Sequence, residues 1–246
     1  MPGVRVWSGG MMGDPMDHFK RIYTQRAGDY HRMITPEDVE GNLLPALESV
    51  MPLRGKRILD LGTGTGRLPL LLKEQVGQLV GLDLHGAMLR ENKAQRNQLD
   101  GRWGLAQADI QMLPVPSDWA EVITAGWAIG HLRSWFTTDW QQKIGRVLRE
   151  MHRVVVASGA LIIIETLTTG GVTPAPPSQA LAEYYAWLEG EWGFTRQAVQ
   201  TDYQFASVDE AIAHTEFFFG PDMAAKIREN GWARIPEWTG VWGKVV

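Results

Sequence analysis

The sequence predicts an α/β fold in which helices cover both faces of a mostly parallel sheet. Two observations carry this prediction. From Arg57 onward, short runs rich in β-branched and apolar residues alternate with segments of helical periodicity, a pattern typical of parallel strands connected by helices. In addition, an apolar run ends in an acid and three glycines at residues 58–71 (ILDLGTGTGRLPLL), where a strand should pass into a helix. The 246 residues are 44% hydrophobic, enough for a sizeable buried core.

Two helical patterns come before the first strand, and each places its apolar side chains on one face. The first face holds Phe19, Ile22, Tyr23, Tyr30 and Met33, and the second holds Val39, Leu43, Leu47 and Val50. Five strands are then expected at RILDL, QLVGLDL, WGLAQAD, AEVITAGW and GALIIIET. The helix between the last two has the clearest apolar stripe, which consists of Trp140, Ile144, Val147, Leu148 and Met151.

A Gly/Pro-rich stretch, GGVTPAPPS at residues 170–178, follows the fifth strand. Beyond it the pattern predicts an aromatic helix (QALAEYYAWLEGEW), a strand (AVQTDYQFAS), two helices to about Asn230 and a final strand near EWTGVWGKVV. The stretch could separate two domains, but few residues follow it. We therefore expect one domain, 1–246, whose sheet is completed by the last two strands. Its parts are a loose N-terminal arm (1–14), N-terminal helices that form a lid (15–52), a ligand-binding core (55–166), and lid helices with the last two strands (170–246).

Composition disfavours several classes of function. The formal charge of −4 and the lack of Lys or Arg runs do not suit a binder of nucleic acid or of an anionic membrane. The absence of cysteine excludes disulfides, thiolate metal sites and cysteine nucleophiles, and suits the cytoplasm. The first residues hold no apolar block long enough for a signal peptide or a membrane span. The six histidines show no metal-binding spacing, so we expect no metal.

The glycines after the first strand indicate a ligand site. Ligands of parallel sheets bind outside the carboxyl ends of the strands, and glycines let a ligand approach the backbone closely. A helix that begins near Gly66 also directs free N–H groups toward that space. Dinucleotides and S-adenosylmethionine are both compatible ligands, but Gly62, Gly64 and Gly66 read G-x-G-x-G and not the dinucleotide pattern G-x-G-x-x-G.

The motif DLGTGTG at residues 60–66, with acids at the ends of the next two strands, resembles the class I S-adenosylmethionine-dependent methyltransferases of small-molecule type, whose first motif is D/E-x-G-x-G-x-G. The resemblance covers about residues 55–166 and extends more weakly to YTQRAGDYHRM, which is similar to an N-terminal A-x-x-Y helix that closes over the cofactor. It implies a Rossmann-like, doubly wound sheet of seven strands with an antiparallel last strand, and S-adenosylmethionine as cofactor. One departure is Ala157-Ser158-Gly159, where the family usually has a Pro-Gly-Gly-type turn.

The same resemblance implies the cofactor site. Asp83 would bind both ribose hydroxyls, a task that suits a carboxylate because it can accept two hydrogen bonds. Asp109 would accept from the adenine amino group beside Ile110. Either acid alone could instead cap a helix or start a turn, but such residues at the ends of successive strands favour the cofactor. The full implied set is Asp60, Gly62, Thr63, Gly64, Gly66, Asp83, Leu84, Met88, Asp109, Ile110, Gly126, Trp127 and Tyr23.

Three residues are candidates for catalysis, namely His131, Glu165 and Tyr30. His131 follows the fourth strand, where the acceptor should lie, and could act as a base, orient the substrate or only cap a helix. Glu165 could be a base or a solvated carboxylate at the edge of the sheet. We expect Trp127, His131, Tyr23, Tyr30 and the aromatic helix to enclose one apolar cavity. The aromatic residues of that helix are at a spacing that is also typical of core: they are Tyr184, Tyr185, Trp187 and Trp192.

The expected function is methyl transfer to a small-molecule acceptor by direct in-line displacement, with alignment and exclusion of water as the main tasks of the protein. A protein or RNA methyltransferase is an alternative, which an open groove would favour over a deep cavity. A non-catalytic S-adenosylmethionine-binding module is another, which a blocked acceptor space would favour. An NAD-dependent oxidoreductase is disfavoured by the glycine spacing. The acceptor atom and the oligomeric state are left open.

Overall fold

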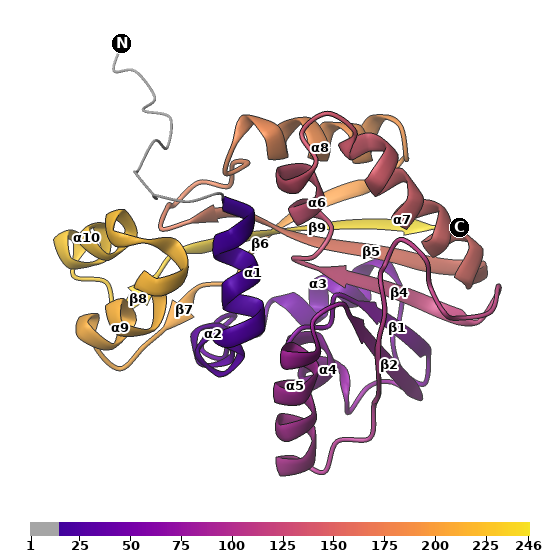
Figure 1. Cartoon of the computed structure of the whole chain (residues 1–246), viewed down its shortest axis with the longest axis horizontal. Coiled ribbons are helices and arrows are strands. Elements are labelled where there is room, and N and C mark those ends of the chain that lie inside the picture. Colours follow the sequence, from indigo (N-terminus) through magenta and orange to yellow (C-terminus); the bar gives the residue numbers. More distant parts are fainter. Residues whose placement is uncertain (1–14) are drawn as a thin grey trace.

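A seven-stranded sheet forms the centre of the computed structural model, which describes residues 15–246 (Figure 1). The strand order is β3-β2-β1-β4-β5-β9-β6, and every pair is parallel except the two that involve β9. The strands are β1 (Arg57–Leu61), β2 (Gln78–Asp83), β3 (Gly104–Gln107), β4 (Ala120–Gly126), β5 (Val155–Thr169), β6 (Thr195–Gln200) and β9 (Glu237–Val245). The predicted doubly wound, mostly parallel sheet with an antiparallel last strand is confirmed. The predicted arm at residues 1–14 lies outside the described residues.

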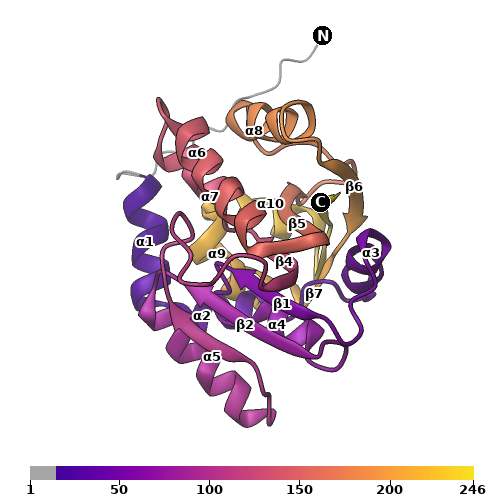
Figure 2. The same cartoon turned by 90° about the vertical axis from the view of Figure 1, so that its right-hand side faces the viewer.

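Helices cover both faces of this sheet (Figure 2). They are α1 (Pro15–Gln25), α2 (Ala27–Ile34), α3 (Leu43–Val50), α4 (Arg67–Leu72), α5 (Gly86–Gln98), α6 (Gly130–Trp135), α7 (Trp140–Val154), α8 (Gln179–Gly190), α9 (Val208–Phe219) and α10 (Pro221–Asn230). Alternate residues of β5 point to opposite faces: Leu161 and Ile163 pack with α7 and α8, whereas Ile162 and Ile164 pack with α3 and α4. No helix of the described part of the chain combines the length and the apolar character needed to cross a membrane.

A small unit lies at one end of the sheet and was not expected as such. The sequence predicts one strand over AVQTDYQFAS, but β6 ends at Gln200 and a second strand, β7 (Tyr203–Gln204), pairs with β8 (Arg234–Ile235). Between the two strands the buried side chain of Asp202 accepts hydrogen bonds from the Glu237 backbone N–H and from Arg234, which fixes the break. The strands β7 and β8 and the helices α9 and α10 share a hydrophobic cluster of their own.

The same unit reaches the N-terminal helices. Phe217 and Phe218 of α9 pack with Tyr23 of α1, Tyr30 of α2 and Met88 of α5. Segments far apart in sequence therefore meet over the carboxyl ends of β1, β2 and β4, where α2 lies beside α9 (Figure 1). This position makes α1, α2 and α9 the cover of any ligand bound at the strand ends.

Candidate active site

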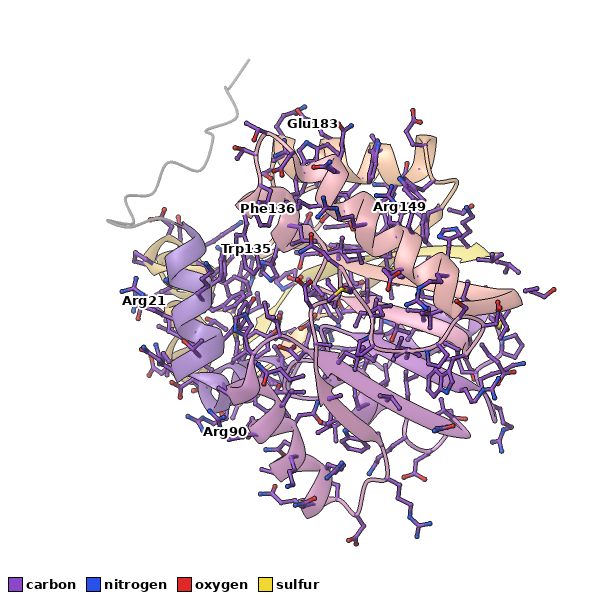
Figure 3. All side chains as sticks on the ribbon, turned by 45° about the vertical axis from the view of Figure 1, so that its right-hand side comes forward. Arg21, Arg90, Trp135, Phe136, Arg149 and Glu183 are labelled. Atoms are coloured by element: carbon purple, nitrogen blue, oxygen red, sulfur yellow. The ribbon has the colours of Figure 1, made fainter. Side chains whose placement is uncertain are left out.

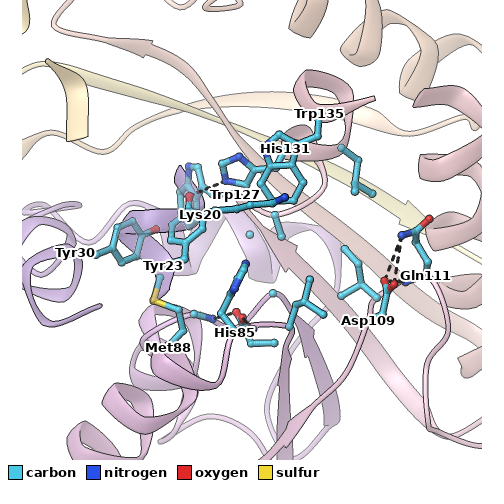
Figure 4. Close-up of a pocket in the computed structure, with 18 of the residues that line it drawn as sticks. Lys20, Tyr23, Tyr30, His85, Met88, Asp109, Gln111, Trp127, His131 and Trp135 are labelled. Atoms are coloured by element: carbon cyan, nitrogen blue, oxygen red, sulfur yellow. Dashed lines mark hydrogen bonds between the residues drawn. The ribbon is translucent and has the colours of Figure 1, made fainter. Parts of the chain in front are cut away.

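A cavity of about 330 Å³ lies at the carboxyl ends of β1, β2 and β4 beneath α1 and α2 (Figure 4). Its position is the one where ligands bind in parallel α/β sheets. Residues from the ends of four strands and from the four helices α1, α2, α5 and α6 converge there. Of the residues expected from the sequence, the cavity is lined by Tyr23, Tyr30, Gly62, Gly64, Asp83, Leu84, Met88, Asp109, Ile110, Gly126, Trp127 and His131.

The three glycines of the turn after β1 have different surroundings. All have positive φ, at 67° for Gly62, 53° for Gly64 and 102° for Gly66. A Cβ on Gly62 would lie 2.4 Å from the Cβ of Ala128, and one on Gly66 would lie 3.0 Å from the Asn92 side chain. A Cβ on Gly64 would meet only the Gly62 carbonyl oxygen, 3.9 Å away. Gly64 is therefore the position where the missing side chain leaves room in the cavity, whereas the other two glycines permit packing.

Asp83 ties the end of β2 to this turn. Its carboxylate accepts hydrogen bonds from the backbone N–H of Gly64 at 2.8 Å and from that of His85 at 2.7 Å. Burial raises the pKa of Asp83, and the hydrogen bonds from His85 and Gly64 act against this rise. Each carboxylate oxygen has a further lone pair, so Asp83 can still accept from two hydroxyls in the cavity.

Three residues of the expected cofactor set, Asp60, Thr63 and Gly66, do not line the cavity but lie behind the turn. Asp60 is 1% exposed and accepts from the Thr124 hydroxyl at 2.7 Å. Burial, as the main cause, raises the pKa of Asp60 to about 7. The Thr63 backbone N–H donates to the Leu82 carbonyl at 2.8 Å. These contacts join β1 to β4 and β2, so they hold the turn in place from below.

A tyrosine and a histidine of the cavity lining face each other. The Tyr23 hydroxyl lies 2.8 Å from Nε2 of His131. Burial lowers the pKa of His131 to about 4, with a smaller contribution from His85, and burial raises the pKa of Tyr23 well above its ordinary value. The imidazole is therefore neutral and the phenol protonated at pH 7, and Tyr23 donates to His131 in the tautomer that carries its ring proton on Nδ1. Tyr30 packs edge-on against Tyr23, with ring centroids 5.7 Å apart.

Trp127 forms part of the same wall in a conformation that is unusual for its size. Its φ is 51°, in the left-handed region that bulky residues rarely adopt. The Arg67 guanidinium lies 3.4 Å from the centre of its ring, and Arg67 also pairs with Glu37 at 2.5 Å. Backbone strain of this kind often occurs at functional sites. Arg67 thus links the Trp127 indole to Glu37, in the chain segment that follows α2.

Glu165, the third catalytic candidate, does not line the cavity. Its side chain is 5% exposed and accepts from the backbone N–H of Gly130 at 2.7 Å. Burial raises the pKa of Glu165 to about 8. The carboxyl group is thus neither solvated nor in contact with the cavity, but lies beside the first residue of α6.

The aromatic helix also lies elsewhere. Tyr184 and Tyr185 of α8 are buried in the core on the α7 face of the sheet, where Tyr185 packs against Trp242 with ring centroids 4.5 Å apart. The expected role of this helix as a cavity wall is thus filled by other residues. Trp135 and Phe136, labelled in Figure 3, lie at the end of α6 and line the cavity instead.

Sequence analysis did not select seven residues that line the cavity. They are Lys20, His85, Gln111, Ala128, Leu132, Trp135 and Phe136. Helical spacing could have found some of them, because Lys20 is three residues before Tyr23 and Trp135 is four residues after His131. No group of three or more His, Cys, Asp or Glu side chains among the described residues could hold a metal ion.

The core of the chain is similar to known methyltransferases. Residues 59–163 match the family model described as a methyltransferase domain. Malonyl-[acyl-carrier protein] O-methyltransferase of Legionella pneumophila is 28% identical over 148 residues, which are 59% of this chain and 49% of that protein. Demethylmenaquinone methyltransferase of Thermus thermophilus is 31% identical over 144 residues, which are 57% of each protein. The chain thus spans about half the length of the curated relatives it matches.

Solved structures resemble this chain over a larger share of its length. Phosphoethanolamine N-methyltransferase 2 of Haemonchus contortus, in complex with S-adenosyl-L-methionine, superposes with a TM-score of 0.57 at 15% identity, over 96% of this chain and 60% of that one. An S-adenosylmethionine-dependent methyltransferase from Aquifex aeolicus gives 0.52 at 17% identity, over 95% of this chain and 100% of that one. At these identities the likeness shows the fold, and it confirms the Rossmann-like sheet that the sequence predicts.

Proposed function

We propose that this chain, whose residues 59–163 form a methyltransferase domain, transfers a methyl group from S-adenosylmethionine to a small-molecule acceptor. The observation that supports this most is one cavity with two unlike parts. One part of its lining offers the Asp83 carboxylate and the space above Gly64, and another part offers the Tyr23 hydroxyl against His131. We propose that the whole chain acts as one such domain, in the cytoplasm, with α1, α2 and α9 as the lid.

The chemistry of the residues around Asp83 and Gly64 suits the cofactor. Asp83 offers free lone pairs to the ribose hydroxyls. Asp109 and Ile110 line the part of the cavity beyond β3 and would hold the adenine. Gly62, Gly64 and Gly126 would lie along the methionine portion. Bound in this way, S-adenosylmethionine supplies an electrophilic methyl group that needs no covalent intermediate with the protein.

The task of the remaining residues is to align an acceptor and to exclude water. The cavity lining also contains the aromatic side chains of Trp127, Trp135 and Phe136. If the acceptor is a hydroxyl compound, its proton can pass to the Tyr23 oxygen while the Tyr23 proton passes to Nε2 of His131, which leaves His131 protonated and Tyr23 unchanged. A neutral imidazole can receive this proton, although a pKa of about 4 makes it a weak base; a positioned general base contributes about 10²–10⁴ in rate when its pKa lies near the working pH.

A small molecule suits the site better than a macromolecule. The named acceptors of the two relatives above differ, one being malonyl-[acyl-carrier protein] and the other demethylmenaquinone, so the relatives do not select one acceptor. The chain has a formal charge of −4, which does not favour RNA as a partner. The part of the cavity around Tyr23 and His131, which we assign to the acceptor, is rich in aromatic side chains and lies under a helical lid, a setting that excludes water from a small substrate.

A labelling experiment separates the alternatives. The chain is incubated with S-adenosylmethionine that carries a radioactive methyl group. Three parallel reactions each also contain one fraction of a bacterial extract: low-mass compounds, protein or RNA. We expect label in the low-mass fraction and much less label with the His131→Ala variant. Label in protein or RNA would support a macromolecular methyltransferase instead. Binding of S-adenosylhomocysteine without transfer to any fraction would support a non-catalytic module.

A further inference from the structure

The buried carboxyl group of Glu165 lies between the sheet and the helix that carries His131. Glu165 belongs to β5, which pairs with β4 on one side and with β9 on the other, so its backbone is fixed at the centre of the sheet. Its Oε1 atom accepts the Gly130 N–H at 2.7 Å. Gly130 begins α6, and His131 is the next residue.

The residue at position 130 matches this contact. A Cβ on Gly130 would lie 2.8 Å from Oε2 and 3.1 Å from Cδ of Glu165, both closer than a real Cβ tolerates without a shift. Glycine costs a helix about 1 kcal/mol relative to alanine. The glycine at the start of this helix of six residues is therefore explained by packing, because it lets the carboxyl group of Glu165 approach.

Two other side chains of the first turn of α6 make contacts of a different kind. Leu132 packs into the core cluster that includes residues of α7 and β5, and Arg133 pairs with Glu183 of α8 at 2.8 Å. The segment before α6 is tied to β5 by the Trp127 backbone N–H, which donates to the Ile164 carbonyl at 2.7 Å. The hydrogen bond from Gly130 to Glu165 is the side-chain contact that extends this attachment to the first residue of α6.

We propose that Glu165 is a positioning residue, whose carboxyl group sets the first turn of α6 so that His131 meets the Tyr23 hydroxyl in the cavity. This inference rests on the proposed function, because it assigns the pair of Tyr23 and His131 to the acceptor. It also explains how an acid within β5 can matter for the reaction without contact with the cavity.

The test compares Glu165→Gln with Glu165→Ala in the full chain. The amide keeps an oxygen that accepts the Gly130 N–H, and because burial raises the pKa of Glu165 to about 8, it also resembles the protonated acid present at pH 7. We expect Glu165→Gln to keep turnover within about twofold. Glu165→Ala should lower kcat by about tenfold or more, within the range of a mispositioned base, while affinity for S-adenosylhomocysteine stays unchanged.

A second measurement does not depend on turnover. The titration of the His131 ring, followed by NMR, should show a low pKa in the wild type and in Glu165→Gln. In Glu165→Ala the pKa should move toward the ordinary histidine value, because the ring is no longer held in its buried position. Tyr185→Phe is the matched control: it removes a hydrogen bond from the Tyr185 hydroxyl to the Thr166 carbonyl of β5 but leaves the bond from Gly130 to Glu165 intact, and should leave both readouts unchanged.

Gly130→Ala completes the test, with far-UV circular dichroism to confirm that each variant is folded. Alone it should impair turnover as Glu165→Ala does, although alanine favours helix. Combined with Glu165→Ala it should add no further loss, since its methyl group then meets no carboxyl. An unchanged His131 titration in Glu165→Ala, additive losses in the double variant, or equal losses for Gln and Ala would overturn the positioning role. A shifted titration without methyl transfer by the wild type would leave this role intact and refute the proposed function.

Discussion

Gly62 and Gly64, two of the three glycines that follow β1, should respond differently to the same substitution. Gly62→Ala and Gly64→Ala both place an L side chain at positive φ, which costs about 1–2 kcal/mol in each case. The new methyl group of Gly62→Ala would lie 2.4 Å from the Cβ of Ala128, whereas that of Gly64→Ala would lie no closer than 3.9 Å to a protein atom outside its chain neighbours. The first methyl group must displace protein, and the second occupies the cavity.

These distances give different magnitudes for stability and for binding. Overpacking adds about 1–3 kcal/mol to the backbone cost, so Gly62→Ala should lose about 2–5 kcal/mol of unfolding free energy. Gly64→Ala should lose only about 1–2 kcal/mol. For binding of S-adenosylhomocysteine, Gly64→Ala should be the more damaging of the two substitutions. Its methyl group takes the space of the ligand, and we expect the affinity to fall tenfold or more, which is about 1.4 kcal/mol or above.

Urea unfolding measures the first quantity and isothermal titration calorimetry the second, on the same preparations of each variant. A single transition with an unchanged m value keeps the stability comparison valid. The reasoning is refuted if Gly64→Ala binds S-adenosylhomocysteine as the wild type does, because the cofactor then does not pass over this turn. It also fails if Gly62→Ala is as stable as Gly64→Ala, because the contact with Ala128 then carries no cost.

Three further outcomes follow from the site. Asp83→Ala should lower S-adenosylhomocysteine affinity by about 1–3 kcal/mol, because hydrogen bonds to a charged acceptor are lost; calorimetry that shows equal affinity would contradict the ribose assignment. Burial raises the pKa of Asp60 from 3.8 to about 7, so between these values the folded protein keeps a proton that the unfolded chain releases. The contribution of Asp60 to the unfolding free energy is therefore largest below about pH 4 and is lost as the pH rises through about 7. Asp60→Asn should therefore make the unfolding free energy in urea fall less between these pH values, and a parallel fall in both proteins would refute the shift. For a hydroxyl acceptor, Tyr23→Phe should lower kcat about as much as His131→Ala, by about 10²-fold or more, with little change in KM; a much smaller effect of Tyr23→Phe would show that His131 takes the proton directly.

The sequence was most informative where chemistry is local to a strand end. The glycines, Asp83 and Asp109 each follow an apolar run directly, and parallel topology brings the ends of such runs together, so most residues of the expected cofactor set line one cavity. The position of His131 after β4 was informative for the same reason. These residues of the cavity could thus be predicted from their positions after the strands, without knowledge of any contact between side chains.

What could not be predicted depends on contacts between distant segments. The lid residues Phe217 and Phe218 reach Tyr23 only because β7 and β8 pair and turn α9 back over α1, and two strands of two residues each leave almost no pattern in the sequence. The burial of Glu165 is of this kind too: it depends on Gly130, which is 35 residues away in the chain. Helical spacing likewise could not tell whether the aromatic residues of α8 face the core or a cavity.

The central claim is that the cavity at the end of β1 binds S-adenosylmethionine. Isothermal titration calorimetry of the full chain with S-adenosylhomocysteine, and separately with NAD, tests it most directly because no acceptor has to be known. The account predicts saturable binding of S-adenosylhomocysteine at one site per chain, weakened in Gly64→Ala and in Asp83→Ala, and weaker or no binding of NAD. Absence of binding by the folded wild-type chain, tighter binding of NAD, or binding that both substitutions leave unchanged would contradict it.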